Sequence, residues 1–402
     1  MSVVSPRLNR VLVAAALGLI IAVCASLMTE ENPSAAITRG DFPAFYTLAV
    51  LAHSAEGHRL YDLELQQQIQ NTAWPTLSGT ALPAAYPAFL AALLEPLAML
   101  SPSTARIVWV CCMVVCAVLG VGILARSVPS LRGSWWQLVV GAFLFGPLFL
   151  GVLGGQIVGL SVLLYAALIA LNVRVGRGKE VLFGVVTGVW MFKPHYALAV
   201  VAMMVFQRRW IALGGWAFVS ALYWILGAQL AGVHWVSDWL SFAQQFAQID
   251  MVTNSYQMTG LVPALHSMLA VGGASSLISP HGFELLNVVC ALLVPLALFV
   301  VVRRARGTAG EWMVPLLAVG PLLLLCAPAV NFYDLSLGLV SLLAIFHPRE
   351  RRDMGLATSL LVASQFLVLC KGEEIPGGAF LFALVFVGIA GRVLSRRVSS
   401  AN

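Results

Sequence analysis

Four ionisable side chains stand at the ends of long apolar runs, where a membrane protein meets water. Asp41 follows the first apolar run, and Asp334 begins a later one. Between them, Lys193 and His195 flank a proline that interrupts another run. A carboxylate accepts a proton, whereas lysine and histidine can balance the charge of a phosphate. This combination favours chemistry on an anionic substrate that is attached to a lipid.

The elements that must position these residues are membrane helices. Of the 402 residues, 60% are hydrophobic and 10% are charged, whereas soluble domains are typically about 45–50% apolar and about 25% charged. This composition excludes a soluble enzyme, a secreted domain and a disordered chain. We therefore predict an all-α, polytopic membrane protein that forms one domain over 1–402. The seven cysteines lie in apolar runs without metal-site spacing, so no metal is expected.

The positions of the lysines and arginines predict how the chain crosses the membrane. Most of the 23 lysines and arginines form short clusters between apolar runs, namely Arg7/Arg10, Arg126/Arg132, Arg174/Arg177/Lys179, Arg208/Arg209, Arg303/Arg304/Arg306, Arg349/Arg351/Arg352 and Arg392/Arg396/Arg397. Under the positive-inside rule these clusters face the cytoplasm. The runs then predict twelve spans, over 11–28, 105–125, 136–152, 157–173, two within 181–206, 210–231, 284–302, 312–328, 332–346, 355–371 and 376–392.

Two long external segments follow from this topology, 29–104 and 232–283. The apolar stretch 84–100 contains two prolines and a glutamate, so we interpret it as an interfacial or re-entrant helix. A span is the alternative. Apolar and aromatic residues at helical spacing from Phe42 onward predict interfacial helices in the first external segment. No P-loop motif is present, which argues against ATP-driven transport.

Several short motifs, in order, carry a family resemblance. They are Arg39-Gly40-Asp41-Phe42, Tyr46, Gly57 to Asp62, Tyr86-Pro87-Ala88-Phe89, Glu95-Pro96-Leu97-Ala98, Gly155-Gln156, Lys193-Pro194-His195, Gln207-Arg208-Arg209-Trp210 and Tyr333-Asp334-Leu335. Over about 39–346 the chain resembles the polyprenyl-phosphate-sugar-dependent glycosyltransferases of family 87, which include mannosyltransferases that elongate phosphatidylinositol mannosides. One departure is Ala88, where the family often has a second proline.

The resemblance implies a GT-C-type fold and a catalytic acid in the first external segment. It implies transfer of a sugar, mannose by default, from a polyprenyl-phosphate donor to a lipid or glycan acceptor, with inversion. Asp41 is then the general base, and Lys193, His195 and Arg39 are expected to bind the donor phosphate. Alternatives remain: Asp41 as a helix N-cap, Lys193 snorkelling to the interface, His195 as a structural histidine, and Arg39 as a solvated surface residue.

Weaker candidates for sugar or acceptor binding are Gln156, Tyr46, Tyr86, Arg59, His266 and Asp334. Each has a structural alternative: turn packing for Gln156, interfacial anchoring for the two tyrosines, a solvated surface position for Arg59 and a helix cap for Asp334. His266 lies in the second external segment and would have to reach the same cleft.

The expected location is a bacterial cytoplasmic membrane, with the active site on the extracytoplasmic side. The expected partners are membrane lipids, the polyprenyl-phosphate-linked sugar and a lipid or glycan acceptor. We expect no cofactor, no nucleic acid and a monomer. A transporter or flippase of lipid-linked sugars is the main alternative, and a non-catalytic membrane scaffold is a second. A transporter would need a central polar pathway, whereas the predicted spans are apolar.

Overall fold

The computed structural model describes residues 40–75, 82–172, 176–274, 277–327, 330–347, 350, 353, 355–357, 359–364 and 375–399. The predicted first span, 11–28, and Arg39 lie outside these residues. Within them the protein is helical, and the only extended pairing is one isolated bridge between Met258 and Asn331. The all-α prediction is therefore confirmed for the described part of the chain.

The helices follow one another along the chain as α3 (Phe42–His53), α4 (Leu63–Ala73), α5 (Ala88–Leu94), α6 (Pro102–Ser127), α7 (Trp135–Phe143), α8 (Gly146–Leu153), α9 (Val158–Asn172), α10 (Arg177–Val189), α11 (Pro194–Phe206), α12 (Trp210–Ala231), α13 (Trp235–Asn254), α14 (Leu261–Val271), α15 (Pro280–Ala305), α16 (Met313–Cys326), α17 (Leu335–Ile345) and α19 (Gly378–Ser399). Short 3₁₀ turns include η2 (Gly57–Arg59), η4 (Glu95–Met99), η5 (Pro129–Leu131), η6 (Trp190–Phe192), η7 (Ser255–Gln257) and η9 (Phe332–Asp334).

Three helices in the described residues are long and apolar enough to cross a membrane: α6, α12 and α15. The bent pair α7 and α8 makes a fourth if it counts as one span. Several shorter apolar helices, among them α9, α11 and α16, pack beside them. The chain therefore has the helices of a membrane protein, while the count of twelve spans remains a prediction.

Local sequence explains where the long helices begin. Ser101 accepts the backbone N–H of Thr104 at 3.3 Å and is followed by a proline in the first turn of α6. Ser279 caps α15 in the same way, again with a proline after it. A serine cap satisfies an N–H that lacks a helical partner, and proline lacks one there without cost. The predicted span 210–231 coincides with α12.

Two predicted helices differ from the structure. The single helix predicted over 136–152 is broken into α7 and α8, which meet at an angle of 70°. Pro147 occupies the first turn of α8 and cannot donate a hydrogen bond backward into α7. The first external segment also differs, because α3 is buried along most of its length. It is a core helix within the protein, and its position relative to the membrane surface remains a prediction.

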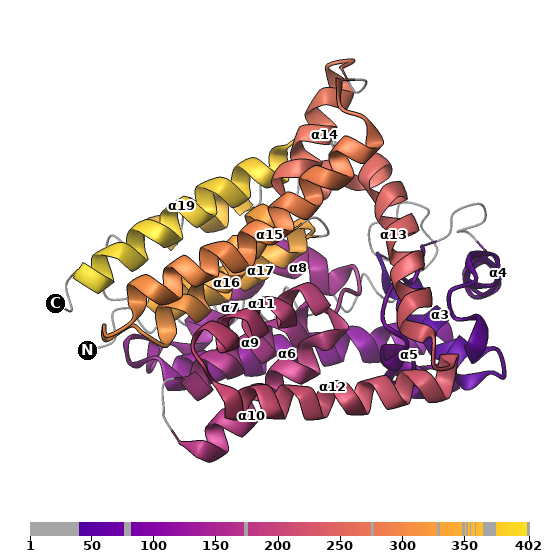
Figure 1. Cartoon of the computed structure of the whole chain (residues 1–402), viewed down its shortest axis with the longest axis horizontal. Coiled ribbons are helices and arrows are strands. Elements are labelled where there is room, and N and C mark those ends of the chain that lie inside the picture. The colour runs from indigo at the N-terminus through magenta and orange to yellow at the C-terminus, as the bar shows by residue number, and fades with distance from the viewer. Residues whose placement is uncertain are drawn as a thin grey trace.

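Different helices occupy the two ends of the molecule. α3, α4, α5 and the start of α13 gather at one end, on the right in Figure 1. The beginning of α10 lies at the other end, where α15 and α19 also finish (Figure 1). α12 runs between the two ends. α5 and η4 together are shorter than the roughly 20 residues that a straight span needs, and the interfacial interpretation of 84–100 remains a prediction.

Candidate functional site

Two glycine contacts fix the start of α3 against the turn between α8 and α9. Gly40 has φ +46°, and a Cβ there would lie 2.0 Å from the carbonyl oxygen of Gly154. Gly155 has φ +72°, and its Cβ would lie 2.6 Å from Cβ of Phe42. Only glycine accepts both the backbone angle and the contact. The backbone N–H of Asp41 then donates to the Gly154 carbonyl at 2.9 Å.

The Asp41 carboxylate is bound from the same turn. Asp41 occupies the N-cap position of α3, yet its side chain makes no capping hydrogen bond. The side-chain amide of Gln156 donates to Oδ2 of Asp41 instead. Gln156 is 3% exposed, and its Oε1 atom is buried without a hydrogen-bond partner among the described residues. Buried polar atoms usually have a partner, so this oxygen is a candidate to accept a hydrogen bond from a ligand hydroxyl.

α6 closes the site from one side. Trp109 donates its indole N–H to the Gly155 carbonyl at 2.7 Å, and its ring lies 5.0 Å from the ring of Phe45. Arg106 stands one turn earlier on the same face of α6 and is 3% exposed. Arg106 is not among the residues predicted from the sequence. Its signal is an arginine at the start of an apolar run, remote from the basic clusters.

Lys193 and Asp334 form a buried ion pair. The proline at 194 begins α11, and Lys193 before it is extended, with φ −120° and ψ 83°. Its Nζ lies 2.7 Å from Oδ1 of Asp334, and both side chains are less than one-tenth exposed. Oδ2 of Asp334 accepts the backbone N–H of Asn331 at 3.1 Å. The predicted break at 193–195 is confirmed, and Lys193 has a charged partner instead of reaching for the interface.

Tyr333 joins the ion pair to the turn that holds Asp41. Nζ of Lys193 lies 5.0 Å from the centre of the Tyr333 ring, a typical cation–π distance. On the other side, a Cβ at Gly151 would lie 2.9 Å from Cβ of Tyr333. The carbonyl of Gly151 accepts the backbone N–H of Gln156 at 2.8 Å. Asp41 and Lys193 are therefore connected through one continuous set of contacts.

The negative charges of Asp41 and Asp334 both act on the phenol of Tyr86. Burial raises the pKa of its phenol well above the usual value, and the negative charges of Asp41, Asp334 and Asp250 raise that pKa further. These three carboxylates come from α3, η9 and α13, which are far apart in the sequence. The Tyr86 ring lies 4.8 Å from the ring of Phe45. Tyr86 thus stands among three acidic groups at the α3 end of the molecule.

The segment 232–283 contacts the residues just before η9. The backbone N–H of Thr259 donates to the Val330 carbonyl at 2.9 Å, next to the bridge between Met258 and Asn331. Burial raises the pKa of the Asp250 carboxyl in α13, while a hydrogen bond from Asn254 opposes the shift. His266 contacts Ser255 at 3.3 Å and packs against Phe283. No described contact brings His266 to Asp41 or Lys193.

The remaining candidates have local structural contacts. Tyr46 donates its hydroxyl to the Leu100 carbonyl at 3.1 Å and packs against Trp74. Arg59 is exposed and pairs with Glu56 and Asp62 on its own turn. The His195 ring lies 4.2 Å from the Tyr196 ring, and its Nε2 atom is buried without a hydrogen-bond partner among the described residues. Arg39 lies outside the described residues.

The arrangement brings together a carboxylate, a neighbouring amide, a buried ion pair and aromatic side chains. An ionised carboxylate accepts a proton from a hydroxyl, and a lysine ammonium donates up to three hydrogen bonds to an anion. In the described residues, no group of three or more histidine, cysteine, aspartate or glutamate side chains is arranged to hold a metal ion. These groups suit proton removal beside an anionic leaving group.

Comparison with known proteins assigns the chain to a family. The model of glycosyltransferase family 87 matches residues 84–328. This segment contains Tyr86, Gln156 and Lys193, while Asp41 and Asp334 lie on either side of it. The comparison found no matching curated protein and no matching solved structure. The family match covers more than half of the 402 residues, and it confirms the resemblance seen in the motifs. The chain belongs to glycosyltransferase family 87.

Proposed function

We propose that this protein transfers a sugar, most simply mannose, from a polyprenyl-phosphate donor to a lipid or glycan acceptor. The reaction takes place beside the turn between α8 and α9 that contacts Asp41, on the membrane face that the charge bias of the loops predicts to be extracytoplasmic. The family supports a glycosyltransferase, and the apolar helices support a membrane location. A donor that is anchored in the membrane by its polyprenyl chain is consistent with both the glycosyltransferase family and the membrane location.

The proposed step is a single displacement with inversion. The acceptor hydroxyl oxygen attacks the anomeric carbon of the donor sugar, and the bond from that carbon to the phosphate oxygen breaks. The carboxylate of Asp41 takes the proton of the hydroxyl as the new bond forms. The polyprenyl phosphate leaves with the bonding electrons. Gln156 orients the carboxylate through its side-chain amide, and its buried Oε1 accepts a hydrogen bond from a sugar hydroxyl.

Lys193 supplies the balancing charge for the leaving phosphate. Asp334 takes one of the three N–H bonds of its ammonium, which leaves two N–H groups to donate to phosphate oxygens of the donor. Preorganised donors of this kind stabilise the charge that develops in the transition state. His195 adds a ring nitrogen beside Lys193. The ion pair holds the ammonium in position before the donor arrives, and that removes a reorganisation cost from the reaction.

The observation that carries the proposal is the placement of Asp41. Its carboxylate is held by a neighbouring amide instead of capping its own helix, and it shares the surroundings of Tyr86 with Asp334. A carboxylate that only capped α3 would bond to the backbone of the first turn. Asp41 then serves as the base, and Lys193, which is connected to it through Tyr333 and the α8–α9 turn, supplies the positive charge that transfer from a phosphosugar requires.

The test is the variant Asp41→Asn. Asparagine keeps the size of the side chain but cannot accept the proton, so transfer from labelled polyprenyl-phosphate mannose to native lipid acceptors is expected to fall about 10²–10⁴-fold. Donor binding, measured by retention of the labelled donor on purified protein, should change little. Glu64→Gln is the matched control, because Glu64 is exposed on α4 in the same external segment. Its transfer rate should equal that of the unmodified protein.

Two results would contradict the proposal. Unchanged transfer in Asp41→Asn would remove Asp41 from the chemistry. Movement of the lipid-linked sugar across a vesicle membrane without any transfer, in both the unmodified protein and Asp41→Asn, would favour the flippase alternative. A panel of polyprenyl-phosphate sugars in the same assay identifies the sugar that is transferred.

A further inference from the structure

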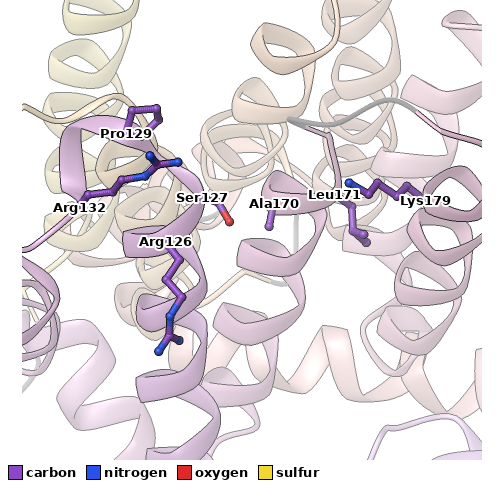
Figure 2. Close-up of a pocket in the computed structure, with 7 residues that line it drawn as sticks. All are labelled: Arg126, Ser127, Pro129, Arg132, Ala170, Leu171 and Lys179. Atoms are coloured by element: carbon purple, nitrogen blue, oxygen red, sulfur yellow. The ribbon is translucent and has the colours of Figure 1, made fainter.

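A basic pocket lies at the end of α6 that is remote from the candidate site. Its volume is about 330 Å³. Arg126 and Ser127 from the last turn of α6, Arg132 after η5 and Lys179 from α10 line it together with Ala170 and Leu171 of α9. Figure 2 shows Lys179 and Arg132 extending toward each other from opposite sides of the opening. α6 rises about 1.5 Å per residue, so this pocket and Arg106 stand near opposite membrane surfaces.

The positive charge of the pocket is not balanced locally. No acidic residue lines it. Glu180 is the carboxylate next to Lys179 in sequence, and it is bound by two N–H groups of Arg209 at 2.8 and 3.0 Å. Among the described residues, neither Arg126, Arg132 nor Lys179 forms an ion pair with a carboxylate. Three neighbouring cations repel one another, so an anionic ligand stabilises this arrangement.

The side chain of Arg126 runs back along α6 instead of away from the membrane. Its Nη1 atom would lie 3.9 Å from a Cβ at Gly122, one turn earlier, and Figure 2 shows it pointing away from the loop that carries Arg132. Arginines at helix ends commonly reach outward to water. Arg126 is exposed and lies along the surface of α6, so its guanidinium remains accessible to an anionic group.

An exposed apolar stripe leads to the pocket along the same helix. Val115 is 55% exposed and Leu119 is 52% exposed. With Arg126 they follow helical spacing of four and seven residues and so share one face of α6. From Val115 to Arg126 the helix rises about 16 Å, which is comparable to the length of an acyl chain. An apolar stripe that ends in a cationic pocket is complementary to a lipid with a negatively charged head group.

We propose that this pocket binds the phosphate head group of an anionic phospholipid, with an acyl chain along the Val115–Leu119 face of α6. Basic pockets between transmembrane helices on the cytoplasmic side commonly hold anionic head groups. The occupant is a membrane lipid and not a soluble anion, because the apolar stripe continues directly from the cations. The site is separate from the proposed chemistry at Asp41 and does not depend on it.

The test is native mass spectrometry of the purified full-length protein in detergent, titrated with phosphatidylglycerol or phosphatidylcholine that carry the same chains. The unmodified protein should retain phosphatidylglycerol at least ten-fold more tightly. The double variant Arg132→Gln/Lys179→Gln should weaken this binding about five-fold for each lost cation, which is about 25-fold in total. Arg177→Gln is the matched control, because Arg177 is exposed on α10 but does not line the pocket.

A charge-preserving variant separates lost charge from lost fold. Arg132→Lys/Lys179→Arg should bind phosphatidylglycerol within two-fold of the unmodified protein. Equal binding of the two lipids would overturn the proposal, as would equal losses in Arg177→Gln and the double variant. Displacement of phosphatidylglycerol by an equal concentration of glycerophosphoglycerol, which has the head group without acyl chains, would also overturn it by showing a site for a soluble phosphate.

Discussion

The Lys193–Asp334 pair buries two charged side chains together in the protein. Two opposite charges are buried together at 2.7 Å, and each would be expensive without the other. Asp334 also belongs to a capping box, in which its side chain accepts the Asn331 N–H while the Asn331 side chain accepts a backbone N–H. The same carboxylate therefore orders the turn before α17 and holds the lysine that precedes α11.

Replacement of one partner should destabilise the protein more than replacement of both. Lys193→Met and Asp334→Leu each leave one buried charge, so each should lower the free energy of unfolding by about 3–5 kcal/mol. The double variant leaves no charge and should recover most of that loss. Chemical unfolding in detergent, followed by tryptophan fluorescence, measures all three.

The transfer assay then separates structure from chemistry at this pair. If Lys193 balances the negative charge of the donor phosphate, the double variant should recover most of the lost stability. It should nevertheless transfer sugar at least 10²-fold more slowly than the unmodified protein. Full activity in a stable double variant would show that the pair serves the fold alone.

At the scale of elements, the start of α3 depends on its contact with the α8–α9 turn. The turn contributes Gly154, Gly155 and Gln156, and each of them touches the first residues of α3 through backbone or side chain. A turn between two short helices thus positions a carboxylate that is more than a hundred residues earlier in the chain.

Gly155→Ala should separate these elements. The added methyl would lie 2.6 Å from Cβ of Phe42 at a residue with φ +72°, so α3 or the turn must move, and the backbone itself costs about 1–2 kcal/mol. A displacement of about 1 Å at Asp41 is expected to slow transfer about 10²-fold. Thermal unfolding and the transfer assay, run on the same sample, measure both effects.

Gly141→Ala is the matched control for this substitution. Gly141 lies within α7, and a Cβ there meets nothing within 4 Å. Alanine is favoured over glycine in a helix, so this variant should keep full activity and unfold at the same or a slightly higher temperature. A similar loss of activity in both variants would mean that the close contact at Gly155 is not what positions Asp41.

At the scale of the whole molecule, the candidate active site and the cationic pocket lie toward opposite ends of the protein. The candidate active site lies at the start of α3, against the turn between α8 and α9, and the cationic pocket lies where α6 ends and α10 begins. If the charge bias of the loops sets the orientation, the pocket faces the cytoplasm and the candidate site faces outward. The active site then receives donors and acceptors from the outer leaflet.

Cysteine labelling in intact cells tests this orientation. In a background with the seven cysteines replaced by alanine, His58→Cys in η2, within the predicted first external segment, should react with a membrane-impermeant maleimide from outside. Gly178→Cys near the pocket should react only after the cells are opened. Both positions are exposed. The reverse pattern, or labelling of both positions from outside, would contradict the proposed topology.

The sequence alone determined the membrane class, the family resemblance and most helix positions. Composition excludes a soluble fold whatever the packing, and long apolar runs between basic clusters predict α6 and α12 without tertiary information. The proline after Lys193 likewise predicts the break before α11. These features are local, so a linear pattern contains them.

Only the tertiary structure decided which side chains meet. The pairing of Lys193 with Asp334 joins residues 141 positions apart, and the bond from Gln156 to Asp41 joins residues 115 apart. Apolar periodicity does not specify such contacts, because many helix arrangements bury the same residues. It also could not show that α3 is buried on nearly all sides, since burial depends on the neighbours that the fold places around a helix. Helix positions follow from the local chain, whereas the site follows from packing between distant segments.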